Sequence, residues 1–168
     1  GYGSGDILGH RVRLNADRFT EADGESIPTG RIREVAGSPL DFRQFHAVGE
    51  RIDADSDQLR QAGGYDHNWI LNRNGGGLAL CGEVIDDRSG RRLTCRTTSP
   101  CVQFYTGNHL SGRRGKGGLP MVSRTGLCLE TQYAPDAVNH PEWDSPVLKA
   151  GEPYDHTTVY RFDTVDQI

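Results

Sequence analysis

The sequence predicts an all-β protein built as an antiparallel β-sandwich. Of its 168 residues, 22 are glycine and 8 are proline, and this density of turn-forming residues favours short strands over long helices. Several segments alternate apolar and polar residues with the period of a strand. Residues 157–162 (TTVYRF) are β-branched and aromatic, which is typical of strands. No linker, repeat or low-complexity segment divides the chain, so residues 1–168 are predicted to form a single domain.

The amino-acid composition argues against two classes of binding partner, nucleic acids and membranes. The formal net charge of -4 gives no reason to expect nucleic acid or an anionic membrane, and no apolar stretch is long enough to span a bilayer. The four cysteines form no C-x-x-C pair and lie in or beside apolar segments. We therefore expect buried free thiols and neither zinc ligands nor disulfides. Free thiols favour a reducing compartment, and we expect the cytoplasm.

The first third of the chain contains two predicted strands. Residues 7–14 (ILGHRVRL) end in apolar residues that alternate with arginines, which indicates a half-buried strand. Residues 31–35 (RIREV) form the second, and the arginines of both are assigned to solvated faces. Residues 53–60 could hold one short helical turn, and we expect its acids and Gln58 to lie on the surface.

Residues 63–71 (GGYDHNWIL) are more informative. The two glycines permit unusual backbone angles, and residues 65–68 then place four polar groups before an apolar run. This pattern predicts a ligand site on the lip of a buried strand. The alternative is an Asx turn that leads into the strand.

The middle of the chain predicts three further strands. Residues 78–85 and 90–98 flank a turn and are interpreted as a strand pair. Residues 101–107 (CVQFYTG) alternate, so that Gln103 and Tyr105 share one face. Amide and phenol groups that line a cleft can bind sugar hydroxyls, and an aromatic ring can pack on a sugar face.

A short apolar run at residues 127–129 ends on an acid, Glu130. Gly126 precedes the run and Pro135 follows it, so we expect a buried strand that opens into a loop. A carboxylate that loses water at the end of such a strand becomes a useful general base. The alternative is an edge glutamate paired with a lysine or arginine.

Three of these stretches together resemble the aldose 1-epimerases, or galactose mutarotases: residues 64–68 (GYDHN), 102–108 (VQFYTGN) and 129–132 (LETQ). Each motif is weak alone, but the ordered set runs from end to end of the chain. The other matching segments are residues 4–9 (SGDILG), 15–17 (NAD), 27–30 (IPTG), 135–139 (PDAVN), 151–152 (GE) and 154–158 (YDHTT).

The resemblance implies a galactose mutarotase-like supersandwich that interconverts the α and β anomers of free hexoses such as galactose or glucose. It also implies that no metal or cofactor is needed. By resemblance, Glu130 would be the general base, Asp66 would bind sugar hydroxyls and help to orient Glu130, and Gln103 would be a further sugar contact. The implied ligand is a monosaccharide.

The chain departs from the family in lacking the segment that carries the family's acid histidine. That histidine lies just before the part that residues 4–9 match, so the chain resembles the C-terminal half of an epimerase. An incomplete sandwich exposes edges and apolar faces, and we expect it to pair with the N-terminal half or with a second copy, or to be poorly stable alone. No histidine is assigned as the acid. His67 is expected to support the loop at Asp66, and His109, His140 and His156 are expected in loops or on the surface.

Two alternatives remain open. A non-catalytic carbohydrate-binding module would keep the sugar site without turnover. A relative that acts on a phosphorylated sugar would use the basic loop at Arg113, Arg114 and Lys116, although a solvated loop is a simpler explanation of these residues.

Overall fold

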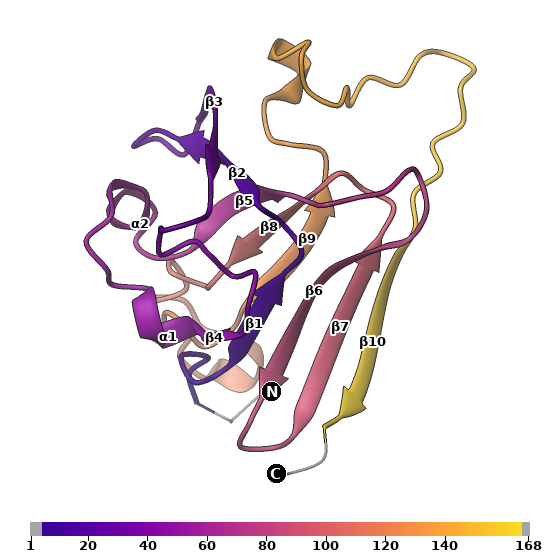
Figure 1. The fold of residues 1–168 in the computed structure, drawn as a ribbon. Coiled ribbons are helices and arrows are strands. Elements are labelled where there is room, and N and C mark those ends of the chain that lie inside the picture. Colours follow the sequence, from indigo (N-terminus) through magenta and orange to yellow (C-terminus); the bar gives the residue numbers. More distant parts are fainter. Residues whose placement is uncertain (1–4, 166–168) are drawn as a thin grey trace.

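The computed structural model describes residues 5–165, which form two antiparallel sheets that pack face to face (Figure 1). In the first sheet the strand order is β10-β7-β6-β1-β4, and in the second it is β3-β2-β5-β8-β9. The first sheet contains β1 (Arg11–Leu14), β4 (His46–Ala47), β6 (Ala79–Asp86), β7 (Arg91–Thr97) and β10 (Thr158–Thr164). The second contains β2 (Arg18–Ala22), β3 (Pro28–Glu34), β5 (Asp66–Ile70), β8 (Cys101–Tyr105) and β9 (Cys128–Gln132).

Helical structure is confined to short pieces. These are α1 (Val48–Arg51), α2 (Asp57–Ala62) and the 3₁₀ turns η1 (Lys116–Gly118) and η2 (Ala137–Asn139). A long segment that includes η2 connects β9 to β10 and extends beyond one end of the sheets (Figure 1). No helix within residues 5–165 is long and apolar enough to cross a membrane. The prediction of an antiparallel all-β fold is confirmed.

Aromatic residues fill the centre of the space between the sheets. The Phe42 ring meets Tyr65 and Phe104 edge-on, at centroid distances of 5.0 and 5.5 Å, and all three side chains are buried. Trp69 packs on Phe104 and donates its indole N–H to the Leu40 carbonyl at 3.2 Å. Buried aromatic side chains of this kind dominate core energetics when their polar atoms find partners. The core therefore fixes β5 and β8 in one register.

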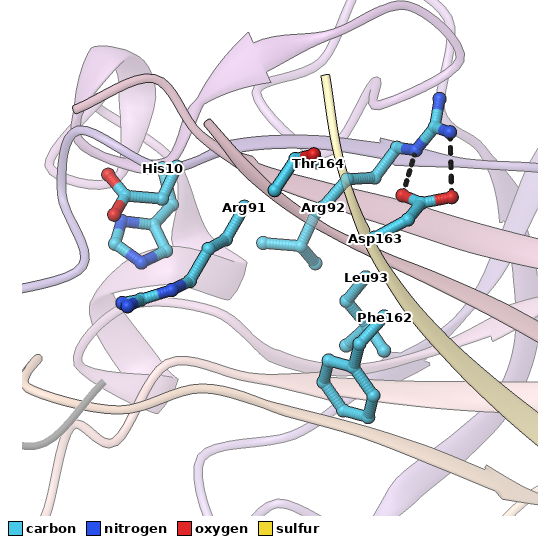
Figure 2. Close-up of a pocket in the computed structure, with 9 residues that line it drawn as sticks. His10, Arg91, Arg92, Leu93, Phe162, Asp163 and Thr164 are labelled. Atoms are coloured by element: carbon cyan, nitrogen blue, oxygen red, sulfur yellow. Dashed lines mark hydrogen bonds and ion pairs between the residues drawn. The ribbon is translucent and has the colours of Figure 1, made fainter. Parts of the chain in front are cut away.

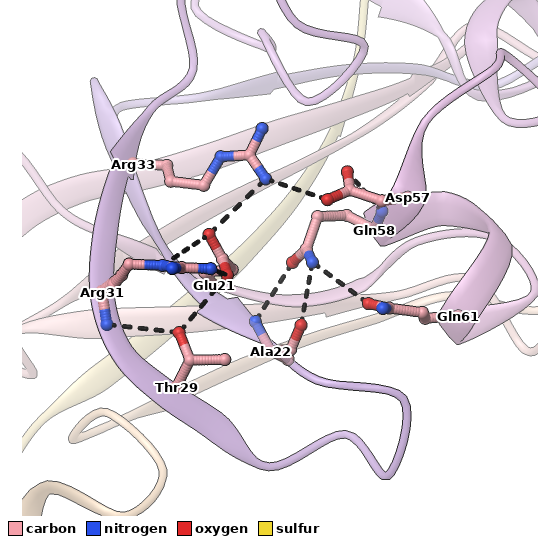
Figure 3. Close-up of polar contacts among 8 residues, drawn as sticks. All are labelled: Glu21, Ala22, Thr29, Arg31, Arg33, Asp57, Gln58 and Gln61. Carbon is pink, nitrogen blue, oxygen red and sulfur yellow. Dashed lines mark hydrogen bonds and ion pairs between the residues drawn. The ribbon is translucent and has the colours of Figure 1, made fainter.

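Most of the predicted strands are confirmed. The hairpin appears as β6 and β7, and residues 101–107 and 7–14 contain β8 and β1. Residues 157–162 and 31–35 overlap β10 and β3, but β10 ends later, at Thr164, and β3 begins earlier, at Pro28. The strand β2 was not predicted, because Glu21 obscures its alternation. This acid is buried beside β3, where it pairs with Arg31 and, at 3.6 Å, with Arg33 (Figure 3). A buried charge is tolerated because it is paired and hydrogen-bonded.

The prediction that Gln58 lies on the surface is wrong. Gln58 is 2% exposed and belongs to α2. Its side chain accepts a hydrogen bond from the Ala22 N–H at 3.1 Å and donates one to the Ala22 carbonyl at 2.8 Å (Figure 3). The pairing of β2 with β5 ends at Thr20, just before Ala22. Gln58 therefore replaces a neighbouring strand where the ladder stops.

We expect Gln58→Ala to lower the free energy of unfolding by about 1–3 kcal/mol, because both backbone groups of the half-buried Ala22 lose their partner. Urea unfolding followed by circular dichroism measures the change. The matched control is Gln44→Ala, an exposed glutamine away from this contact, where we expect less than about 0.5 kcal/mol. Equal effects of the two substitutions would contradict this role for Gln58.

Candidate active site

Side chains on β5 alternate between the core and a polar surface of the second sheet. His67 and Trp69 are buried in the core, whereas Asp66 and Asn68 lie on the other side. Residues 65–68 therefore do not form a polar cluster on the lip of a strand, and they are not an Asx turn. The strand begins at Asp66. Tyr65 is buried, and its hydroxyl donates a hydrogen bond to the Pro39 carbonyl at 3.1 Å.

The register of the second sheet brings together the three residues proposed from the sequence. On β8, Gln103 lies directly opposite Asn68 of β5 and Glu130 of β9. Directly opposed residues have Cβ atoms about 4.5–5.5 Å apart. The Gln103 amide also donates to the Asp66 carboxylate at 2.8 Å. The shared face of Gln103 and Tyr105 is confirmed, since Val102 and Phe104 between them are buried in the core.

Two further amides join this group. Asn68 belongs to the stretch predicted as a ligand site, whereas sequence reasoning missed the role of Gln132. Gln132 Nε2 donates to Asn68 Oδ1 at 3.2 Å and to Gln103 Oε1 at 3.4 Å. Asn68 Nδ2 in turn donates to Thr20 Oγ1 at 3.3 Å. The available signal was the spacing of two between Glu130 and Gln132, which places both on one face of a strand. We call the surface formed by Asp66, Asn68, Gln103, Glu130 and Gln132 the polar face.

Glu130 differs from its expected setting in two ways. It lies in the middle of β9 rather than at the end of a strand, and its side chain is exposed. The expected burial is wrong because β9 is the edge strand of the second sheet. The alternative of a paired edge glutamate is not seen either, since no lysine or arginine within residues 5–165 forms an ion pair with Glu130.

The cysteines follow the prediction at three of four positions. Cys81, Cys95 and Cys101 are buried free thiols, but Cys128 is exposed. Cys128 lies two residues before Glu130 on the polar side of β9, opposite Tyr105. Partial burial and the nearby Glu130 carboxylate raise the pKa of the Cys128 thiol. Within residues 5–165 no group of three or more His, Cys, Asp or Glu side chains is placed to hold a metal ion.

His67 supports the backbone of Asp66 from the core side. The ring is 3% exposed, packs edge-on against Phe19 and Trp69, and accepts a hydrogen bond from the Asp66 N–H at 3.1 Å. Burial lowers the pKa of His67 to about 4, so the ring is neutral near pH 7. The other three histidines considered in the sequence lie in loops, as expected: His109, His140 and His156.

Residues 133–145 fold over one end of the polar face. A cavity of about 210 Å³ lies beneath them, lined by Arg18, Ile70, Cys101 and Trp143 among others.

The same segment contacts β3 through His140. The ring of His140 stacks on Trp143, with the ring centroids 4.1 Å apart, and lies against Gly30. A Cβ atom at Gly30 would lie 2.9 Å from the His140 ring, and the positive φ of 84° also favours glycine.

A larger hollow lies elsewhere, on the interior side of the first sheet (Figure 2). It has a volume of about 600 Å³, and its apolar lining includes Val84, Leu93 and Phe162. The Arg92–Asp163 ion pair, at 2.7 Å, lies apart from Leu93 and Phe162 (Figure 2). His10, Asp86 and Arg91 also line this hollow, but its exposed lining is mostly apolar. It therefore has the character of an uncovered core surface rather than of a sugar site.

Comparison with known proteins identifies the family. The family model described as aldose 1-epimerase matches residues 2–161. The chain belongs to the aldose 1-epimerase family. A galactose mutarotase from Bos taurus is 42% identical over 163 residues, which cover 96% of this chain and 46% of the relative. An aldose 1-epimerase from Escherichia coli (strain K12) is 36% identical over 159 residues, which cover 94% of this chain and 46% of the relative.

Solved structures agree on the fold. An aldose epimerase homologue from C. elegans superposes with a TM-score of 0.81 at 25% identity, over 98% of this chain and 49% of that protein. A galactose 1-epimerase from Lactobacillus acidophilus NCFM gives a TM-score of 0.66 at 21% identity, over 95% of this chain and 45% of that protein. The predicted galactose mutarotase-like fold is confirmed. The chain spans about half the length of the curated relatives it matches.

Acid should destabilise the protein through His67. The pKa of this ring is about 4 in the folded protein against an ordinary 6.5, so the unfolded chain binds the proton more tightly. The stabilisation is complete above pH 6.5 and is lost as the pH falls toward 4, by at most roughly 3 kcal/mol. Urea unfolding between pH 7 and pH 4 should show a smaller loss in His67→Gln than in the unsubstituted protein. His109→Gln, at an exposed position, is the control, and parallel pH profiles for all three proteins would refute the assignment.

Proposed function

We propose that this chain forms the sugar-binding part of an aldose 1-epimerase that interconverts the α and β anomers of free hexoses such as galactose or glucose. The observation that carries the proposal is the meeting of Asp66, Gln103 and Glu130 on one polar face. Membership of the family supports the same reaction class. Buried free thiols at Cys81, Cys95 and Cys101 support the cytoplasm as the compartment.

The reaction needs a base and an acid on opposite sides of the hemiacetal. Glu130 takes the proton of the C1 hydroxyl as the bond between C1 and the ring oxygen breaks, and an acid protonates the ring oxygen. The open-chain aldehyde rotates about the C1–C2 bond, and the ring recloses on the other face with the proton transfers reversed. The Glu130 carboxylate is exposed and forms no ion pair within residues 5–165, which leaves it free to accept this proton.

Asp66 and Gln103 are assigned to the sugar hydroxyls. The ionised Asp66 carboxylate accepts hydrogen bonds, and the Gln103 amide has one N–H beyond the one it gives to Asp66. No histidine side chain within residues 5–165 hydrogen-bonds to Glu130 or Gln103, and we assign the acid to a histidine in the polypeptide that corresponds to the remaining half of the relatives.

The same face would serve a non-catalytic carbohydrate-binding module. A role in binding sugar phosphates has less support, because Arg113, Arg114 and Lys116 are exposed on their loop and Arg114 donates to Gly118 of the same loop at 3.0 Å. The epimerase and the binding module differ in the effect of losing Glu130. An epimerase would lose most of its rate, whereas a binding module has no rate to lose.

Glu130→Gln, made in the full-length protein, should lower kcat by about 10²–10⁴-fold, because the amide cannot accept the C1 hydroxyl proton. Sugar affinity should change by less than about tenfold, since the amide keeps the size and hydrogen-bonding capacity of the side chain. Polarimetry of α-galactose and α-glucose measures the rate, and calorimetric titration measures the affinity. Glu152→Gln, an exposed glutamate outside the strands, is the control. A protein that binds sugar without any rate above background would be a binding module.

The apolar hollow supports a second part of the proposal, a partner polypeptide. Phe162, Leu93, Val84 and Val12 lie opposite one another across four strands and face the sandwich interior. Val12 is fully buried, whereas Phe162 is 77% exposed. We propose that this surface is covered by the polypeptide that corresponds to the remaining half of the relatives. A second copy of the chain is the other candidate.

Phe162→Asp should therefore act differently in two settings. In residues 1–168 alone the side chain is exposed, and we expect the unfolding free energy to change by less than about 0.5 kcal/mol. In the full-length protein, where Phe162 would be covered, the substitution should lower the free energy of unfolding by about 3 kcal/mol or more. Chemical denaturation of both proteins measures the difference. Val159→Asp, on the opposite face of β10, is the matched control. Equal small effects in both settings would show that nothing covers this surface, and concentration-dependent dimerisation of residues 1–168 would favour the second copy.

A further inference from the structure

We propose that Gln132 is a positioning residue that fixes the orientation of the Gln103 and Asn68 amides and holds the strand of Glu130 against the rest of the polar face. This inference rests on the proposed function for its meaning in catalysis. Its structural content is independent of that function, because it concerns hydrogen bonds within residues 20–132.

The direction of the hydrogen bonds follows from Asp66. An ionised carboxylate can only accept hydrogen bonds, so Gln103 must turn its NH₂ group toward Asp66, as the 2.8 Å contact has it. The carbonyl oxygen of Gln103 then points away and needs a donor. Gln132 Nε2 is the side-chain donor that reaches it, at 3.4 Å.

Asn68 gives a second, independent reason for this orientation. Its side chain is 2% exposed, so neither polar atom can turn to bulk water. Asn68 Nδ2 donates to Thr20 Oγ1, and Asn68 Oδ1 accepts from Gln132 Nε2 at 3.2 Å. Removal of the donor would leave a buried carbonyl unsatisfied, which costs about 1–3 kcal/mol. One NH₂ group of Gln132 therefore serves two acceptors.

The position of Gln132 explains how one side chain can do this. Gln132 is on the edge strand β9, opposite Cys101 of β8, and its side chain crosses β8 to reach Asn68 on β5. It thus links three strands on one face. Glu130 lies two residues away on the same strand, and no hydrogen bond within residues 5–165 joins its side chain to another strand. The hydrogen bond from the Gln132 amide to Asn68 thus connects β9, which carries the proposed base, to β5, which carries Asp66.

Gln132→Glu tests this inference sharply, because the substitution keeps the shape and changes only the donors. When ionised, the new carboxylate faces two carbonyl oxygens and repels both. When protonated, it can donate to one of them. Nearby titratable groups are Asp66 on β5, Cys101 on β8 and Glu130 on β9, with Arg18, Glu142 and Asp144 around the adjoining cavity. The unsubstituted protein in the same pH series corrects for their titration.

The measurement is the set of ¹H–¹⁵N signals of the Gln103 and Asn68 side-chain amides between pH 5 and pH 8, with galactose affinity by titration at each end. In Gln132→Glu, we expect both amide signals to titrate and galactose affinity to fall at least tenfold from pH 5 to pH 8. The unsubstituted protein and Gln44→Glu, at an exposed position, should show neither change. Gln132→Met, which has no donor, should weaken affinity equally at both pH values.

The outcomes separate this inference from the proposed function. Amide signals of Gln103 and Asn68 that are the same in Gln132→Glu and the unsubstituted protein at every pH would overturn the role of Gln132. Signals that titrate as expected, in a protein that binds no galactose with or without the substitution, would support the role of Gln132 and count against the proposed function.

Discussion

The candidate site depends on the strict alternation of side chains along β5. Trp69 and His67 are held in the aromatic core, and this forces Asp66 and Asn68 onto the opposite face. A slip of one residue would exchange the two sets and bury a carboxylate among aromatic rings. Core packing therefore specifies the register that places Asn68 opposite Gln103, and stability and site geometry have the same physical origin.

Alternation places the polar side chains, but it does not orient them. Side-chain amides present a donor and an acceptor of similar size, so an amide row has no preferred direction until a charged group sets one. Asp66 supplies that charge. Gln103 donates to Asp66, and its carbonyl oxygen is therefore left to accept from Gln132. Asn68, buried at the centre of the row, keeps the arrangement from relaxing toward solvent. The result is a preorganised surface, whose hydrogen-bonding groups are already oriented before any ligand binds.

Sequence patterns predicted the fold class, the β6–β7 hairpin and the two faces of β8, because each rests on local periodicity. They failed where a long-range partner decides the outcome. The strand β2 was missed because the arginines that neutralise Glu21 lie on the following strand. Gln58 was placed on the surface because its partner, Ala22, lies 36 residues away. Gln132 escaped notice because its partners become neighbours only through the pairing of β5, β8 and β9.

The exposed residues Glu130 and Phe162 lie on neighbouring edge strands of the two sheets, β9 and β10. Along the polar row, burial falls from Asn68 to the exposed Glu130 on β9, and along the apolar row it falls from Val12 to Phe162 on β10. The strands β9 and β10 are themselves adjacent, since the Tyr160 hydroxyl donates to the Leu129 carbonyl at 2.6 Å. One polypeptide that covers both of these strands would bury Phe162 and at the same time bring its own side chains beside Glu130. In that arrangement, the apolar contact would hold the proposed acid near the proposed base, so that assembly and catalysis would depend on a single interface.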